Sequence, residues 1–312
     1  MNFFDKPIVK KTIFFLRLTV PIVLVGVLFA QIDYQTFFGH LRTYPIGSLL
    51  LAVLLIFFAN IIFGFRWWYI LKSVNINLTL YQVFRLTFFS LFLSNFLPSS
   101  VGGDLVKLVG IIDLVDKEKN DIKISSVIVD RLFSMLSKVL LLPFALSFLG
   151  TLKIQVEGIA TQLFFPFTLI PQGIRDKISS YLNAIKPWYS WRIFINILLI
   201  SWLSLTFTTA GYWVIAQPLN PSVSPINILY IAIITYFAII LPISINGIGV
   251  QEMSYVYLLG LLQFTQEQAW TVALIIRLTT IIISLMGGLW MVFDGRELFS
   301  SLMRNKLSIK RE

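Results

Sequence analysis

Two short interruptions in long apolar stretches of the sequence decide the fold. Residues 97–104 read LPSSVGGD and residues 241–249 read LPISINGIG. Both contain Leu-Pro-x-Ser, then glycines, then an acid early in the next apolar run, Asp104 or Glu252. Proline ends helices because it lacks a backbone N–H, and glycine permits tight turns. We therefore predict two broken helical hairpins. The residues of their breaks are Pro98, Gly102, Gly103, Pro242, Gly247 and Gly249.

The apolar runs on either side of these breaks predict an integral membrane protein. Of the 312 residues, 57% are hydrophobic and 13% are charged, whereas soluble domains carry about 25% charged residues. A helix of roughly 20 apolar residues crosses a bilayer. A soluble fold is excluded because it could not bury so many runs. The runs are residues 12–30, 45–64, 79–97, 100–112, 125–149, 158–173, 193–216, 226–242, 247–263 and 268–293.

The distribution of Lys and Arg predicts the orientation of the spans. We assume that the N-terminus is inside and that each broken pair leaves the membrane on the side from which it entered. Seventeen basic residues, Arg66 and Lys123 among them, then fall on inner segments. Only Arg42 and Lys153 fall outside, as the positive-inside rule requires. We expect both termini in the cytoplasm and the chain in the plasma (inner) membrane. The first run is too long for a cleaved signal and is expected to stay as a span.

The order of the runs predicts an inverted repeat. Each half reads span, span, broken pair, span, and crosses the membrane an odd number of times, so the second half is upside down. We expect one polytopic domain, residues 1–312, all α-helical, with about six full spans and two re-entrant or broken hairpins. Repeat 1 covers about 12–149, repeat 2 about 158–293, and residues 294–312 form a basic cytoplasmic tail. Such repeats with discontinuous helices are common in transporters.

The aromatic residues fit this topology. Two groups lie beside basic residues at predicted inner boundaries, where such rings favour the headgroup region. They are Trp67, Trp68 and Tyr69, and Trp188, Tyr189 and Trp191.

Charged residues inside the apolar runs are the candidate site, because an ionised group in a membrane is costly and usually marks a pathway or a pair. We predict a polar groove between the repeats, lined by both breaks. Arg131, Arg277 and Lys107 would offer positive charge to a lipid phosphate. Asp104 and Glu252 would neutralise that charge or attract a cationic headgroup. The substrate-binding candidates are therefore Asp104, Lys107, Arg131, Glu252 and Arg277.

The same charges have structural interpretations. Asp104 can cap its own helix or pair with Lys107, three residues further along, while Glu252 lies too far into its helix for a cap to be expected. A static ion pair that holds helices in register is the alternative role for Asp130 and Arg131.

Other kinds of site find little support. The chain has no cysteine and one histidine, His40, which excludes thiolate metal sites and disulfides and leaves too few ligands for a usual zinc site. We expect no metal and no cofactor. The net charge of +10 follows from the topology, so no nucleic-acid partner is expected.

With these motifs, the chain resembles the flippase-like transmembrane module of bacterial lysylphosphatidylglycerol synthases (the multiple peptide resistance factors) and its stand-alone relatives. The stretches that carry the resemblance are residues 94–98, 102–107, 129–131, 241–242 and 247–252, followed by Gly260 and Arg277. The resemblance implies a membrane fold with re-entrant helices that moves or binds lipids. The relatives often have glycine where this chain has Asn246, so a different turn geometry is expected there. The synthases' soluble aminoacyl-transferase domain is not expected here.

Three functions stay open at the level of the sequence. The first is a lipid flippase or lipid-translocating transporter-like protein, acting on an anionic or modified phospholipid or a lipid-linked intermediate. The second is an integral membrane transferase that acts on a polyprenyl- or glycosyl-linked lipid. The third is a membrane partner of a lipid-modifying enzyme or glycosyltransferase. We favour the first, with no enzymatic activity, because it uses the repeat, the breaks and the intramembrane charges together.

Overall fold

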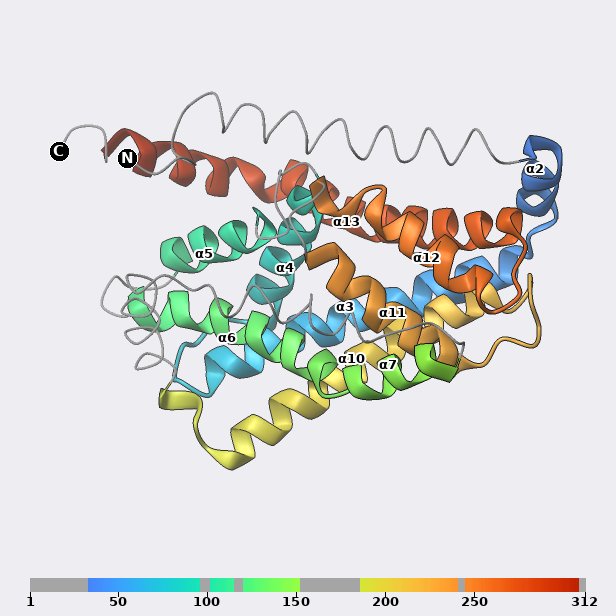
Figure 1. Cartoon of the computed structure of the whole chain (residues 1–312). Coiled ribbons are helices and arrows are strands. Elements are labelled where there is room, and N and C mark those ends of the chain that lie inside the picture. The colour runs from blue at the N-terminus through green and yellow to red at the C-terminus, as the bar shows by residue number, and fades with distance from the viewer. Residues whose placement is uncertain (1–32, 96–101, 115–119, 152–185, 241–244, 309–312) are drawn as a thin grey trace, which may run out of the picture.

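The computed structural model describes residues 33–95, 102–114, 120–151, 186–240 and 245–308 (Figure 1). These ranges form helices and contain no strand, which confirms the predicted all-helical fold. In chain order the α-helices are α2 (Tyr34–Thr43), α3 (Ile46–Lys72), α4 (Leu80–Ser94), α5 (Gly102–Leu114), α6 (Asn120–Val139), α7 (Leu142–Thr151), α10 (Trp191–Ala216), α11 (Pro225–Ile240), α12 (Val250–Gly260) and α13 (Gln266–Ser308). Two 3-10 turns are η3 (Lys186–Trp188) and η4 (Ile245–Gly247). The predicted spans 12–30 and 158–173, as well as Pro98 and Pro242, lie outside the described residues.

Four of the described helical segments are long and apolar enough to cross a membrane. Their lipid-facing sides are apolar: Leu50, Leu199 and Leu289, for example, are each more than half exposed. Such residues are unfavourable in water and favourable against lipid chains. The chain is therefore a multi-pass membrane protein. The four segments are Ile46–Lys72, Asp121–Gly150, Trp191–Ala216 and Gln266–Trp290.

The second of these segments is interrupted between α6 and α7. The break falls at Leu140 and Leu141, just before Pro143. Proline supplies no N–H for the carbonyl of Val139 and its ring collides with that carbonyl, so a continuous helix is disfavoured there. At the end of the chain, α13 continues to Ser308, so most of the predicted tail extends the last span as a helix.

Helices α3 and α10 form an antiparallel pair that joins the two halves of the chain. At one end the Tyr44 hydroxyl donates to the carbonyl of Ile215 over 2.7 Å. At the other end the Asn196 side chain donates to the Tyr69 hydroxyl over 2.8 Å. A Cβ atom added to Gly211 of α10 would come within 2.6 Å of an α3 side chain. Small residues of this kind let membrane helices approach closely.

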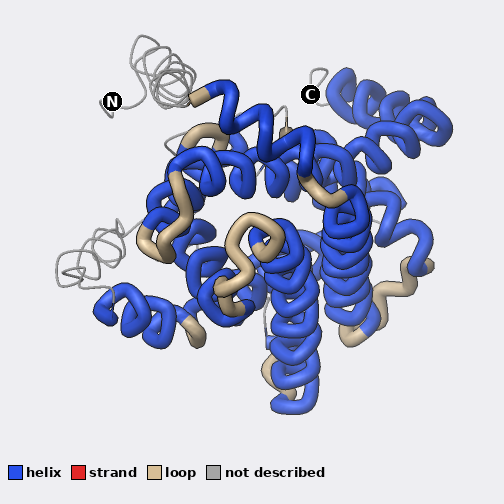
Figure 2. The backbone as a smooth tube through the Cα atoms, turned by 90° about the vertical axis from the view of Figure 1, so that its right-hand side faces the viewer, coloured by secondary structure: helices blue, strands red, loops and turns tan. Residues whose placement is uncertain are grey.

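The two hairpins enter the bundle from opposite ends. The loop before α4 lies at the Lys72 end of α3, where the Trp68 indole N–H donates to the carbonyl of Leu78 over 3.1 Å. The loop before α11 lies at the Ala216 end of α10, where the Trp213 indole N–H donates to the carbonyl of Val223 over 3.0 Å. Because α3 and α10 are antiparallel, these loops lie at opposite ends, and Figure 1 shows α5 and α12 on opposite sides of the bundle. Figure 2 views the packed helices from the α2 end.

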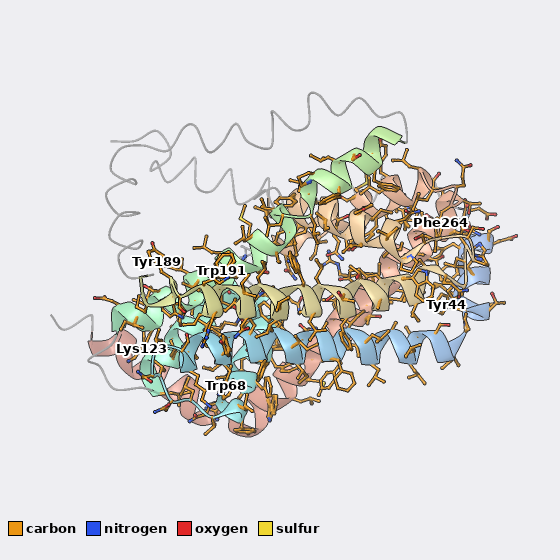
Figure 3. The ribbon with its side chains drawn as sticks, turned by 90° about the horizontal axis from the view of Figure 1, so that it is seen from below. Tyr44, Trp68, Lys123, Tyr189, Trp191 and Phe264 are labelled. Carbon is orange, nitrogen blue, oxygen red and sulfur yellow. The ribbon has the colours of Figure 1, made fainter. Side chains whose placement is uncertain are left out.

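Three of the aromatic residues predicted at inner boundaries lie at the same end of the bundle (Figure 3). Figure 3 shows Trp68, Tyr189 and Trp191 near Lys123 at one end, and Tyr44 at the other. Tyr189 and Trp191 are exposed, which suits rings at a headgroup boundary.

Two of the predicted boundary rings are instead part of the core. Trp67 and Trp188 are fully buried. The Trp188 indole donates to the carbonyl of Ile70 over 3.0 Å, and the Trp67 indole donates to the Ser126 hydroxyl over 3.4 Å. The prediction for these two rings was wrong. Helix α3 runs beyond residue 64 and turns Trp67 inward, and Trp188 of η3 packs against α3 through its hydrogen bond to Ile70. The same extension buries Arg66, which the sequence placed on an inner boundary.

Candidate functional site

The first break brings α4 and α5 into close contact. A Cβ atom added to Gly103 would lie 2.7 Å from the backbone oxygen of Ser90. The two helices can therefore approach this closely only because Gly103 has no side chain. Asn95 forms the C-cap of α4. In the described residues, the polar side chains at the end of α4 are therefore Ser94 and Asn95.

The second break is a tight turn of three left-handed residues. Asn246, Gly247 and Gly249 have φ angles of 48°, 70° and 81°. Glycine adopts this region freely, and asparagine is among the few other residues that tolerate it. Asn246 therefore allows a tight turn at this position, although it carries a side chain.

The two breaks contact one another directly. The Asn246 side-chain amide donates to the Asn95 side-chain oxygen over 2.8 Å. The Asn95 amide in turn donates to the Ser284 hydroxyl of α13 over 2.7 Å. These are the residues at which the hairpins from opposite ends of the bundle meet. This link between the halves was not predicted from the sequence.

Glu252 and Arg277 hold the second break in place. They form an ion pair of 2.5 Å between α12 and α13. The other Glu252 oxygen accepts the Gly249 N–H over 2.7 Å, so Glu252 does cap its own helix, contrary to the expectation from its position. Arg277 also donates to the carbonyls of Asn246 and Gly247 over 3.3 and 3.2 Å. These bonds satisfy backbone groups that would otherwise be unpaired at membrane depth.

Asp104 and Arg131 form the corresponding ion pair between α5 and α6. Their separation in the chain, 27 residues, is close to the 25 residues between Glu252 and Arg277. The side chain of Arg131 is 39% exposed and that of Asp104 is 15% exposed. The first pair is therefore much more accessible than the second. The local pair expected between Asp104 and Lys107 is absent from the described structure, because both residues have partners on α6.

Lys107 belongs to a buried charge cluster centred on Asp130. One Asp130 oxygen accepts from the Arg66 Nε over 2.8 Å, and the other accepts from the Lys107 Nζ over 3.2 Å. Arg66 also donates to the Asp130 carbonyl and to the Ser201 hydroxyl, both over 3.1 Å. The rings of Phe63 and Trp67 lie within 5 Å of these cations, which favours positive charge in a dry environment.

Arg66 is the residue that the sequence-based search missed. It was counted on an inner segment because the apolar run 45–64 was taken to end before it. Its apolar neighbours, Phe63 and Phe65, were the signal that the helix continues past it. Its side chain is 2% exposed, so the cluster carries one more positive charge than was predicted.

A cavity of about 210 Å³, lined in part by charged side chains, lies between the two breaks. It receives side chains from five helices and from η4, so both halves of the chain contribute to its wall. Asp104, Lys107 and Arg131 line it as predicted, whereas Glu252 and Arg277 do not. Arg277 reaches the wall only through the carbonyl of Asn246. The lining residues are Phe63, Arg66, Ser90, Leu91, Ser94, Gly103, Asp104, Lys107, Asp130, Arg131, Ser134, Tyr236 and Asn246.

This arrangement can bind a polar, negatively charged group. The described residues contain no group of three or more side chains that could hold a metal ion. The Arg131 guanidinium is the most accessible ion in the cavity. Guanidinium groups match phosphate and carboxylate oxygens in two parallel hydrogen bonds.

Comparison with known proteins identifies the family. Residues 14–288 match the family model described as the lysylphosphatidylglycerol synthase TM region. A search of the curated proteins gives no match. The family match covers most of the chain and confirms the resemblance drawn from the glycine-acid motifs. The chain therefore belongs to the lysylphosphatidylglycerol synthase transmembrane-region family, and it is a multi-pass membrane protein related to proteins that handle lipids.

Proposed function

We propose that this protein moves a membrane lipid by admitting its polar headgroup into the cavity between the two breaks. The acyl chains would stay in the surrounding hydrocarbon. One observation carries the proposal: the breaks of two hairpins from opposite ends meet at Asn95 and Asn246, beside a cavity that contains charged side chains. Charged groups at membrane depth face polar cavities or pair with each other, and here they do both.

Arg131 is the residue best placed to bind a headgroup phosphate. Its partner Asp104 is also partly exposed, so the pair can open without uncovering a buried charge. Lys107 forms an ion pair with Asp130, lines the cavity and contributes to its positive electrostatic potential. In the empty site Asp104 neutralises Arg131, and an incoming phosphate would replace it.

Glu252 and Arg277 have an indirect role in this proposal. They fix the carbonyls of Asn246 and Gly247, and Asn246 lines the cavity. Loosening this pair would let the second break shift relative to the first. We therefore keep both residues as members of the site, acting on the substrate through the turn.

The similar spacing of the two ion pairs and the opposite entry of the hairpins support an inverted repeat. Such repeats allow one half of a transporter to move against the other around a fixed central site. The excess of Lys and Arg on the predicted inner segments supports cytoplasmic termini in a plasma membrane. Both acids of the cavity are paired with cations, which supports a transport or binding role over an enzymatic one.

Reconstitution into liposomes tests the proposal. The purified protein is placed in vesicles that contain fluorescent anionic, zwitterionic or polyprenyl-linked lipids, and a membrane-impermeant quencher reports the fraction that becomes accessible. We expect faster exchange of at least one lipid between leaflets than in protein-free vesicles. Arg131→Ala should remove most of this activity, and Arg131→Lys should retain part of it. Arg42→Ala, which changes an exposed arginine of α2, is the matched control.

Two results would count against the proposal. The first is the absence of acceleration for all three lipid classes with folded protein. The second is an Arg131→Ala variant that exchanges lipid at the rate of the unmodified protein.

A further inference from the structure

One face of α6 carries a stripe of polar side chains that extends beyond the cavity described above. Arg131, Ser134 and Lys138 follow at positions i, i+3 and i+7, which places them on one side of the helix. The Lys138 Nζ donates to the carbonyl and the hydroxyl of Ser134 over 2.9 and 3.4 Å. It also lies 4.2 Å from the centre of the Tyr236 ring. Ser134 and Tyr236 both line the cavity, so Lys138 adjoins its wall.

Lys138 has no carboxylate partner within ion-pair distance in the described part of the chain. This distinguishes it from the other three cations of the site, each of which contacts an acid. Among the described residues, the site therefore contains four basic side chains and two acids. The cations are Arg66, Lys107, Arg131 and Lys138, and the acids are Asp104 and Asp130.

Among the described residues that line or adjoin the cavity, the excess of basic side chains over acids belongs to the first half of the chain. The pair in the second half, Glu252 with Arg277, is neutral as a whole. A buried basic side chain without a carboxylate partner is costly to keep charged in a membrane, and an anion that enters the cavity would stabilise its charged form. The two halves thus differ in charge even though their ion pairs correspond in spacing.

We propose that the cavity selects lipids whose headgroups carry a net negative charge, and that Lys138 is a specificity-determining residue. The ligand class is a phosphodiester-linked lipid without a compensating cation, with its phosphate near Arg131 and Ser134. A headgroup that carries an aminoacyl cation brings further positive charge into a site already in excess, and is therefore disfavoured. This inference rests on the proposed function, because it names the substrate class of the same cavity.

Native mass spectrometry of the detergent-solubilised protein tests this selectivity without requiring transport. The protein is mixed with equal amounts of phosphatidylglycerol, phosphatidylethanolamine and lysylphosphatidylglycerol, and the bound lipids are counted. We expect phosphatidylglycerol to be retained about tenfold over the lysyl lipid, which corresponds to one charge-assisted hydrogen bond. Lys138→Met should bring that ratio close to one, and Lys138→Arg should preserve it. Lys72→Gln removes a charge from the exposed end of α3 and should leave the ratio unchanged.

Equal retention of the three lipids, or an unchanged ratio in Lys138→Met, overturns the inference. Lys138→Arg keeps the positive charge on a long side chain, so it separates the loss of charge from the loss of the lysine itself. The liposome assay separates the two proposals. Selective binding without exchange between leaflets refutes the proposed function and leaves the selectivity standing. Exchange of all lipids at equal rates, with the same rate in Lys138→Met, refutes the selectivity and leaves the function standing.

Discussion

Replacement of Asp130 by asparagine should destabilise the protein more than any other change to a single carboxylate in the site. Asp130 is the shared partner of Arg66 and Lys107, at 2.8 and 3.2 Å, and all three side chains are at most 3% exposed. Asparagine keeps the shape and one hydrogen-bond acceptor but removes the negative charge. Two buried cations are then left facing each other without compensation.

The size of the effect follows from the burial of the cluster. Removing one partner of a buried ion pair costs about 3–5 kcal/mol, and here two cations lose the same partner. At roughly 2–4 °C per kcal/mol for a chain of this size, the melting temperature should fall by about 6–20 °C. Adding Lys107→Met to Asp130→Asn removes one of the two stranded cations, so the double variant should recover part of the loss.

Thermal unfolding in detergent, followed by tryptophan fluorescence, measures these differences. Asp121→Asn is the control, because Asp121 is an exposed acid in the first turn of the same helix. The reasoning fails if Asp130→Asn melts together with the unmodified protein. It also fails if Lys107→Met deepens the loss in the double variant instead of reversing part of it.

Three further predictions address the packing and the second break. Gly287→Ala should lower the melting temperature in thermal unfolding, because the added Cβ would lie 2.0 Å from an α4 backbone oxygen. Gly47→Ala should leave the melting temperature unchanged, because no atom lies within 4 Å of the added Cβ. Asn246→Gly keeps the left-handed turn but loses the contact between the breaks, so this variant should stay folded and exchange lipid more slowly. Asn246→Ala should be about 1 kcal/mol less stable than the glycine variant, because alanine disfavours the left-handed conformation. Glu252→Gln and Arg277→Ala should both reduce lipid exchange in liposomes. Arg277→Ala should also lower the melting temperature, because two backbone carbonyls lose their hydrogen-bond donor. Normal exchange by both variants would contradict their assignment to the site.

The starts of most helices could be predicted closely from the sequence, but α3 and α13 end at Lys72 and Ser308, beyond the ends of their apolar runs at 64 and 293, and α2 was not predicted. Apolar runs such as 193–216 and 226–242 correspond to α10 and α11 within about two residues. The breaks were also predictable, because proline and glycine act on the backbone locally. Asp104, Lys107 and Arg131 were found because a charge inside an apolar run is conspicuous in any single span.

The partners of these charges were harder to predict, because they depend on how the helices pack. The expected pair of Asp104 and Lys107 satisfied the spacing along one helix, but α6 offers each residue a partner on a different side. Arg66 was missed because a basic residue near the end of a run is usually at the boundary, and only the packing of α3 against α10 shows that it faces inward. The cap formed by Glu252 depends on η4, whose left-handed turn brings the Gly249 N–H back toward the carboxylate.

The contact between Asn95 and Asn246 illustrates the same limit. Neither residue is charged, and 151 positions separate them. Nothing local in the sequence connects them. Their meeting follows only from two hairpins that enter from opposite ends and reach the same depth.

Cross-linking between the two breaks tests the central claim most directly. The sequence contains no cysteine, so Asn95→Cys and Asn246→Cys can be introduced together without a background thiol. With a short thiol-specific cross-linker in native membranes, the account predicts efficient joining of the two positions. A pair of Asn95→Cys with Gly260→Cys, at the far end of α12, should not be joined. Two cysteines that react freely with impermeant reagents on the same aqueous side, and that resist cross-linking, would contradict the account.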